Sequence, residues 1–119
     1  MNFQEFKDFY QKKEVRIEGN RIITKPLVSV LLQTYQHENY IISCLEGILD
    51  QQTNFDIEIL IGEDDSPDKT REICLEYAGK FPEKIKLFLH NRENQIKILG
   101  EPTSNFNAFY NFFSAKGKY

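Results

Sequence analysis

Apolar and polar residues recur along the chain with two periods, which predict strands and helices in regular succession. Short apolar runs, typical of buried strands, occupy residues 27–32, 57–61 and 85–89. Between them, apolar positions recur every three or four residues, which predicts helices over residues 39–51 and 66–81. Strands that alternate with helices of this length favour an α/β fold with a parallel sheet and right-handed crossover connections.

The second of these helices is bounded by residues suited to its two ends. Ser66 is a good N-cap, Pro67 fits the first helical position, and Asp68 complements the positive end of the helix dipole. Pro82 ends the helix because its ring cannot continue the helical hydrogen bonds. The side chains predicted to be buried on its inner face are Ile73, Cys74, Tyr77, Ala78 and Phe81.

The first part of the chain precedes this regular alternation. Residues 2–12 space their aromatic side chains at helical intervals, which predicts a short amphipathic helix. Residues 15–18 and 21–24 flank the pair Gly19-Asn20, a pair suited to a tight hairpin turn. We therefore expect residues 1–25 to form an N-terminal extension made of a short helix and a hairpin.

The last part of the chain is predicted to be a long loop followed by a helix. Residues 90–103 are polar and favour a loop. A helix begins at Ser104, and Gly117 suits its C-terminal end. Its aromatic stripe has helical spacing and favours core packing over a ligand platform; it consists of Phe106, Phe109, Tyr110 and Phe113. Lys118 and Tyr119 should begin another strand, so we expect an incomplete domain.

Composition and charge exclude several classes of protein. A hydrophobic content of 40% with ten Phe and six Tyr favours a globular fold. The net charge of −3, with scattered Lys and Arg, provides no basic stripe for nucleic acid and no polybasic membrane patch. Cys44 and Cys74 are predicted to be buried thiols in a reducing compartment, which favours a cytoplasmic location. His37 and His90 are predicted to be loop histidines, and no apolar stretch is long enough to span a bilayer.

Candidate chemistry lies at the carboxyl ends of the first two apolar strands. Glu63, Asp64 and Asp65 follow one strand, and Thr34 and Tyr35 follow the other. In parallel α/β sheets ligands bind beyond this edge. A tyrosine ring can stack on a base while a carboxylate accepts hydrogen bonds from the nucleoside, so the set suits nucleoside binding. A solvated, helix-capping turn for the acids and ordinary packing for Tyr35 remain alternatives. No glycine-rich dinucleotide-binding loop is present.

Three stretches carry a resemblance to a known family. Residues 27–41, 55–70 and 115–119 resemble the N-terminal half of a family 2 glycosyltransferase. That family has a Pro-Thr-Tyr-Asn signature after its first strand and an Asp-Asp-x-Ser-x-Asp-x-Thr signature after its second. The resemblance covers residues 27–119 and implies a glycosyltransferase A-type, Rossmann-like fold. Residues 26–119 would then form a nucleotide-sugar-binding portion of the domain.

The resemblance assigns roles to four residues of the predicted site. Thr34 and Tyr35 match the Thr-Tyr pair that lines the base pocket. Glu63 and Asp64 match the Asp-Asp pair that contacts the uracil and ribose of a bound uridine nucleotide. The resemblance therefore implies inverting transfer of a sugar from a UDP-linked donor to a glycan or lipid-linked acceptor, at a cytoplasmic location or the inner face of a membrane.

Other positions of the two signatures shape the loops or depart from the family pattern. Gln33 replaces the usual Pro, and Gln36 replaces the usual Asn. The remaining matches to the second signature are expected to shape and cap its turn; they are Ser66, Asp68 and Thr70. Asn107 is the nearest candidate for a last-helix side chain that relatives place near the sugar phosphates, and we leave it unassigned.

The groups that perform the chemical step in this family do not occur in the sequence. Such enzymes hold a divalent cation, Mg²⁺ or Mn²⁺, through an Asp-x-Asp motif, and a base activates the acceptor. No Asp-x-Asp occurs here, so catalytic groups and metal ligands are expected beyond Tyr119. We expect this chain to supply the nucleoside pocket and to lack turnover by itself.

Two other functions are weighed against this interpretation. A phosphorelay receiver also gathers acids at a strand end, but it needs an aspartate after its third strand. Here Leu89 is followed by His90, Asn91 and Arg92, which disfavours a receiver. A non-catalytic remnant that binds a nucleotide or a partner stays open, because a fold does not determine its function.

Overall fold

The computed structural model describes residues 1–19, 21–22, 25–98, 101–103 and 105–119. In chain order, the elements are α1 (Phe3–Tyr10), β1 (Arg16–Glu18), β2 (Val28–Thr34), α2 (Ile41–Leu49), β3 (Ile57–Glu63), α3 (Thr70–Lys80), β4 (Ile85–Leu89), β5 (Ile96–Ile98), β6 (Glu101–Thr103) and α4 (Asn105–Ser114). The predicted α/β class is confirmed. The domain boundary expected near residue 26 stays a prediction.

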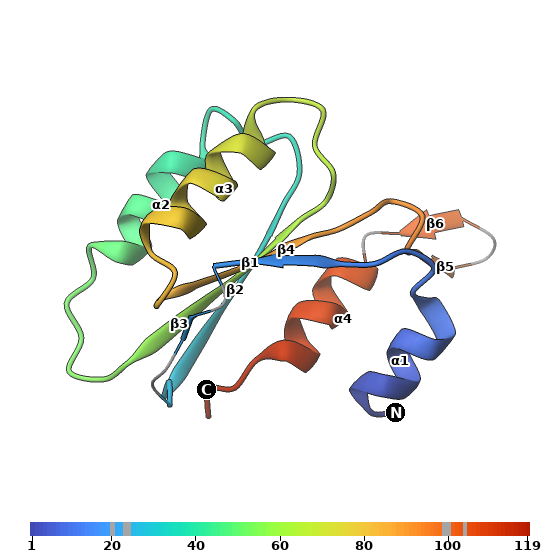
Figure 1. Cartoon of the computed structure of the whole chain (residues 1–119), viewed down its shortest axis with the longest axis horizontal. Helices are drawn as coiled ribbons and strands as arrows, with labels where there is room; N and C mark the ends of the chain where they lie inside the picture. The colour runs from blue at the N-terminus through green and yellow to red at the C-terminus, as the bar shows by residue number, and fades with distance from the viewer. Residues whose placement is uncertain (20, 23–24, 99–100, 104) are drawn as a thin grey trace.

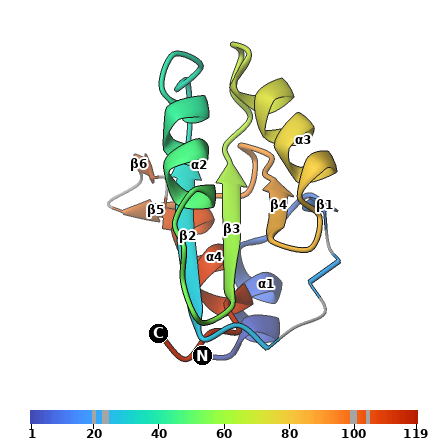
Figure 2. The same ribbon diagram turned by 90° about the vertical axis from the view of Figure 1, so that its left-hand side faces the viewer.

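A four-stranded sheet organises the molecule. Its strand order is β1-β4-β3-β2, with β2, β3 and β4 parallel and β1 antiparallel to β4. The helices α2 and α3 lie together on one face of this sheet, and α1 and α4 lie on the other (Figure 1 and Figure 2). The parallel strands and their crossover helices agree with the sequence prediction.

The two faces of the sheet bury different cores. Toward α2 and α3 the core is mainly aliphatic, and its fully buried members include Leu45, Ile59, Ile61, Ile85 and Leu87. Toward α1 and α4 it is mainly aromatic, with Phe6, Val15, Leu60, Phe88, Phe106 and Tyr110. This division follows from the strand period of two, because successive residues of β3 and β4 point to opposite faces.

The predicted N-terminal hairpin is wrong. Its first arm is β1, but β1 pairs with β4, where Ile17 lies opposite Phe88. Arg21 and Ile22 lie outside any strand, and residues 23–24 lie outside the described residues. The edge of β4 offers β1 the backbone hydrogen bonds that a local hairpin would have supplied. Gly19 has a φ of 71°, and a Cβ there would lie 2.7 Å from the Ile85 carbonyl oxygen.

The second crossover helix begins later than its sequence predicts. α3 starts at Thr70 after Lys69, and Ser66 does not cap it. The Thr70 amide instead donates a hydrogen bond to Asp68 Oδ1 (3.0 Å). The Ser66 hydroxyl is bound elsewhere, because it accepts a hydrogen bond from the Gln36 amide (2.9 Å). A tertiary contact between two loops thus replaces the predicted local cap.

Three further predictions need correction. The segment predicted as a loop contains a small antiparallel hairpin of β5 and β6. In the predicted aromatic stripe, Phe106 and Tyr110 are buried, but Phe109 is 46% exposed. The other side chains that α4 buries are the polar Asn107 and Asn111. Cys74 is buried as predicted, whereas Cys44 is exposed because its neighbours on α2 occupy the inner face.

The strand β2 is less buried than its apolar sequence predicts, because it lies at the edge of the sheet. On its outer side, the Tyr119 amide donates to the Leu27 carbonyl (3.0 Å) and the Ser29 amide donates to the Tyr119 carbonyl (2.8 Å). These are the bonds of a parallel neighbour. Gly117 permits the approach, since a Cβ there would lie 2.5 Å from Ser29 Oγ. Over the described ranges no helix is long and apolar enough to cross a bilayer.

Candidate functional site

The two sequence motifs meet at the carboxyl ends of β2 and β3. These strands run parallel in a register that places Thr34 opposite Glu63. One residue further, the Asp64 amide donates a hydrogen bond to the Thr34 carbonyl (3.0 Å), so the pairing continues into the loops. The four predicted residues therefore come from neighbouring strand ends, which is the edge where parallel sheets bind ligands.

Glu63 is the buried anchor of the acidic loop. Its side chain is 0% exposed, and Oε2 accepts a hydrogen bond from Arg71 Nε at 2.6 Å. The backbone amides of Asp65 and Ser66 donate to the two carboxylate oxygens at 3.1 and 2.7 Å. A buried carboxylate needs such compensation to remain charged. The side chain of Glu63 therefore holds the turn that presents the next residue, Asp64.

Arg71 extends this network to the end of β4. Its Nη2 donates to the His90 carbonyl (2.7 Å) and lies 3.7 Å from Asp65 Oδ1. Asp65 itself has a φ of 59°, an uncommon conformation for a residue other than glycine. The loop is thus fixed by one guanidinium that joins the ends of β3 and β4.

Asp64 is the half-buried acid of the loop. Burial raises the pKa of its carboxyl above the ordinary value of 3.8, and the charges of Glu63 and Asp65 add to the rise. The positive charges of Arg92 and Arg71 oppose that rise in pKa. A carboxyl group that is partly desolvated and close to other acids is typical of ligand sites.

Arg92 is a member of the site that the sequence analysis missed. Its guanidinium carbon lies 4.4 Å from the ring centroid of Tyr35, and its Nη1 donates a hydrogen bond to the Asp64 carbonyl (3.4 Å). Arg92 follows β4 closely, so it lies at the same sheet edge as the two motifs. The sequence offered one signal for Arg92, which is its position two residues after His90 and close to the end of β4.

The first loop is tied to the second by polar contacts. His37 Nδ1 lies 2.9 Å from Thr34 Oγ1 and accepts a hydrogen bond from the Tyr35 amide at 3.3 Å. The His37 amide donates to Thr70 Oγ1 (2.9 Å), which links the loop to α3. His37 is thus a loop histidine, as predicted, and its Nδ1 is an acceptor because an amide can only donate.

Two other residues that the sequence singles out, Asn107 and His90, have side chains on the α4 face of the sheet, outside these loops. Asn107 is buried on the α4 face, where its Nδ2 donates to the Gly62 carbonyl (2.8 Å) and holds α4 against β3. His90 directly follows β4, outside any strand, as predicted, and its ring is buried among aromatic rings. Burial lowers the pKa of His90 to about 4, with a smaller effect of the Arg71 charge.

The acids of this site do not fit a divalent cation. The oxygens of Glu63 are taken by Arg71 and two amides, and the cationic side chain of Arg92 contacts the Asp64 carbonyl. Within the part of the chain that the structure describes, no three His, Cys, Asp or Glu side chains gather as a possible metal site. Hard cations need several free oxygen ligands.

Comparisons with known proteins agree with this geometry. Residues 29–98, which are more than half of the chain, match the family described as Glycosyl transferase family 2. The chain is 39% identical to chondroitin synthase of Escherichia coli over 74 residues, which cover 62% of this chain and 10% of that protein. It is 30% identical to hyaluronan synthase of Pasteurella multocida over 115 residues, which cover 93% of this chain and 10% of that protein.

A third relative extends the range of activities. The chain is 41% identical to the minor teichoic acid biosynthesis protein GgaB of Bacillus subtilis over 58 residues. These residues cover 48% of this chain and 6% of that protein. The chain thus spans a tenth or less of the length of these three relatives. The family match covers both loop motifs and the parallel strands β2 (from Ser29), β3 and β4. The chain therefore belongs to glycosyl transferase family 2.

Proposed function

We propose that this chain supplies the nucleoside-binding part of a glycosyltransferase that transfers a sugar from a UDP-linked donor, with inversion, to a glycan or lipid-linked acceptor. The observation that carries the proposal is the register of β2 and β3, which sets Thr34 and Tyr35 beside Glu63 and Asp64. Family membership supports sugar transfer, and relatives named as chondroitin and hyaluronan synthases support a glycan product.

In this proposal the four residues have two kinds of role. Tyr35 provides a ring for stacking, and the half-buried Asp64 accepts a hydrogen bond from a base N–H. Glu63 and Thr34 are 0% and 1% exposed, so they act as positioning residues that hold the loops. Arg92 is exposed and suits the diphosphate, because a guanidinium binds phosphate oxygens in a bidentate manner.

The catalytic base and the ligands for Mg²⁺ or Mn²⁺ form a separate part of the proposal. They would belong to a longer protein, because the acids that the structure describes do not gather into a possible cation site. A cytoplasmic location, at or near the inner membrane face, is supported by two cysteines that form no disulfide. Sugar turnover by the 119-residue chain alone would contradict this division of labour.

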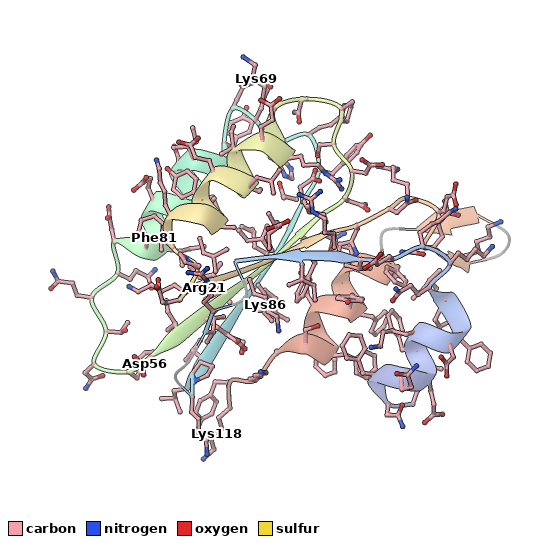
Figure 3. The ribbon with its side chains drawn as sticks, viewed as in Figure 1. Arg21, Asp56, Lys69, Phe81, Lys86 and Lys118 are labelled. Atoms are coloured by element: carbon pink, nitrogen blue, oxygen red, sulfur yellow. The ribbon has the colours of Figure 1, made fainter. Side chains whose placement is uncertain are left out.

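Isothermal titration with UDP, in the presence of a metal chelator, tests the nucleoside pocket. We expect Asp64→Asn to weaken binding by about tenfold, since it removes one charged hydrogen-bond acceptor. Asp56→Asn is the matched control, because Asp56 lies at the opposite end of the sheet from Lys69, which precedes α3 (Figure 3). Equal affinities of the two variants, or a loss seen only with the cation present, would contradict the assignment.

Arg92→Ala separates phosphate recognition from base recognition. We expect this variant to weaken UDP binding by about tenfold while uridine binding changes little, because uridine carries no phosphate. If both ligands lose the same affinity, Arg92 acts through its contact with Tyr35 instead. The non-catalytic remnant predicts the same titrations, so it is distinguished by the absence of sugar transfer in the longer native protein.

A further inference from the structure

A second candidate binding region lies on the other face of the sheet. A groove of about 310 Å³ opens between the sheet, α1 and the end of α4. Ile17, Phe88 and Phe113 contribute apolar side chains to it, and Lys7, Lys86 and Lys116 contribute ammonium groups. Figure 3 shows Lys86 beneath β1, on the side of the sheet where α4 lies. The loops that follow β2 and β3, which carry the proposed nucleoside site, take no part in the lining of this groove.

The three lysines of this groove lack paired carboxylates. Within the described residues, no Asp or Glu oxygen lies within 4.0 Å of their ammonium nitrogens. Two of them lie over aromatic rings instead, Lys7 at 4.4 Å from the Phe3 centroid and Lys86 at 5.9 Å from the Phe88 centroid. The groove is therefore positive, although the whole chain carries a net charge of −3.

Of the three lysines in this groove, Lys86 has the surroundings that least favour a charged ammonium group. Burial lowers the pKa of its ammonium group, and the nearby charge of Lys116 lowers it further. Glu58 opposes the shift, but this buried carboxylate already accepts hydrogen bonds from the Ser29 hydroxyl (2.7 Å) and the Lys116 amide (2.6 Å). An anion in the groove would relieve the repulsion that the lysines exert on one another.

We propose that this groove binds a single-chain anionic amphiphile. Its alkyl chain would lie on the side chains of Ile17 and Phe113, over the buried ring of Phe88, and its phosphate or sulfate head would lie between Lys86 and Lys116. The volume is near the lower limit of small-molecule sites, which suits one alkyl chain and not a folded protein segment. Unpaired ammonium groups beside an apolar floor match both halves of such a ligand.

Titration with decyl phosphate, below the concentration at which it forms micelles, tests the site. Binding is measured by calorimetry, and its location by NMR of the Ile17 methyl groups. We expect decyl phosphate to bind about tenfold more tightly than the neutral decyl maltoside and than inorganic phosphate, since each of these offers half of the interactions. Equal binding of the neutral amphiphile, or Ile17 signals that do not move, would overturn the proposal.

Charge variants give the second test. Lys86→Gln with Lys116→Gln should weaken decyl phosphate binding by about tenfold or more. Lys118→Gln is the matched control, because Lys118 lies outside the groove lining, at the lower edge of the molecule in Figure 3. Lys7→Gln, on α1, tests the opposite rim if the double variant fails to fold. Unchanged affinity in the folded charge variants would overturn the proposal.

Two further results distinguish this site from other ligands. UDP affinity should be the same in all lysine variants, because Lys86 and Asp64 lie on different segments and the groove excludes the nucleoside loops. A failure of UDP binding would therefore contradict the proposed nucleoside site but not the proposed amphiphile site. Association with anionic phospholipid vesicles, combined with no binding of monomeric decyl phosphate, would overturn it in favour of a membrane-binding surface.

Discussion

Glu63 and His90 are two buried ionisable residues at neighbouring strand ends, and their surroundings are opposite. The His90 amide donates a hydrogen bond to the Glu63 carbonyl (2.9 Å), and the two residues are 0% and 2% exposed. The carboxylate of Glu63 has an arginine and two amides as partners, whereas neither ring nitrogen of His90 has a hydrogen-bond partner among the residues that the structure describes. At equal burial, the Glu63 carboxyl thus has partners that compensate for lost water, and the His90 ring does not.

The difference follows from the two faces of the sheet. The Glu63 side chain points toward α3, where Arg71 is available, and the His90 ring packs edge-to-face against Phe106 and Tyr110. A charge away from water requires compensating charges or dipoles, and among the described residues no hydrogen-bond partner supplies them to the His90 ring. The comparison teaches that hydrogen-bond and charge partners, and not depth, distinguish these two buried side chains.

The largest test removes the partner of the carboxylate. Arg71→Met leaves Glu63 buried with an uncompensated charge, and we expect the free energy of unfolding to fall by about 3–5 kcal/mol. Chemical denaturation at neutral pH measures the change. Adding Glu63→Gln to this variant should recover much of the loss, since no buried charge then remains. No recovery would mean that Arg71 acts through packing or through its bond to the His90 carbonyl.

The second test protonates the neutral member of the pair. The pKa of His90 is about 4 in the folded chain, below its ordinary value of 6.5, so the unfolded chain binds the proton first as the pH falls. Stability from this residue is therefore complete above pH 6.5 and is lost as the pH falls to about 4. The loss should reach about 3 kcal/mol, measured by thermal unfolding across this range.

His90→Phe should reduce the dependence of stability on pH in that window, because the aromatic packing is kept without a titrating ring. The chain has two histidines, so His37→Gln serves as the control and should leave the pH dependence of His90 in place. An unchanged slope in His90→Phe would show that acid unfolding depends on the carboxylates instead.

A third test concerns the close approach of α4 to β3. A Cβ at Gly62 would lie 1.8 Å from Asn107 Oδ1, so Gly62→Ala must displace α4 or its side chains. We expect a destabilisation of about 1–3 kcal/mol, as for other overpacked sites. In an Asn107→Ala background the penalty should shrink, and a double-mutant cycle by denaturant unfolding measures the coupling. Full additivity would rule out this contact as the cause.

The smallest test concerns the first loop. Gln36 has a φ of 54°, where Asn is tolerated better than most residues, and Asn is usual at this position of the signature. Gln36→Asn should therefore raise the free energy of unfolding by up to about 1 kcal/mol. Gln52→Asn, at a position without positive φ, should give no gain. A loss of stability in Gln36→Asn would mean that this glutamine side chain makes a useful contact.

Local patterns predicted the parts of the fold that depend on neighbours in sequence. The three parallel strands and the helices between them were predicted within a few residues, because apolar periodicity follows from the face that each element buries. The cap at Ser66 and the hairpin at Gly19 were predicted incorrectly. In both cases a distant group, the Gln36 amide or the edge of β4, replaced the local partner.

For the candidate site, the sequence by itself determined which residues stand at the carboxyl edge of the parallel strands. Thr34, Tyr35, Glu63 and Asp64 each follow an apolar run, and parallel strands bring such ends together. Only the tertiary structure decided their surroundings: that Arg71 neutralises Glu63, that Arg92 covers a face of Tyr35, and that His90 lies in an aromatic core. Burial and pairing arise from contacts between distant segments, and no local pattern encodes them.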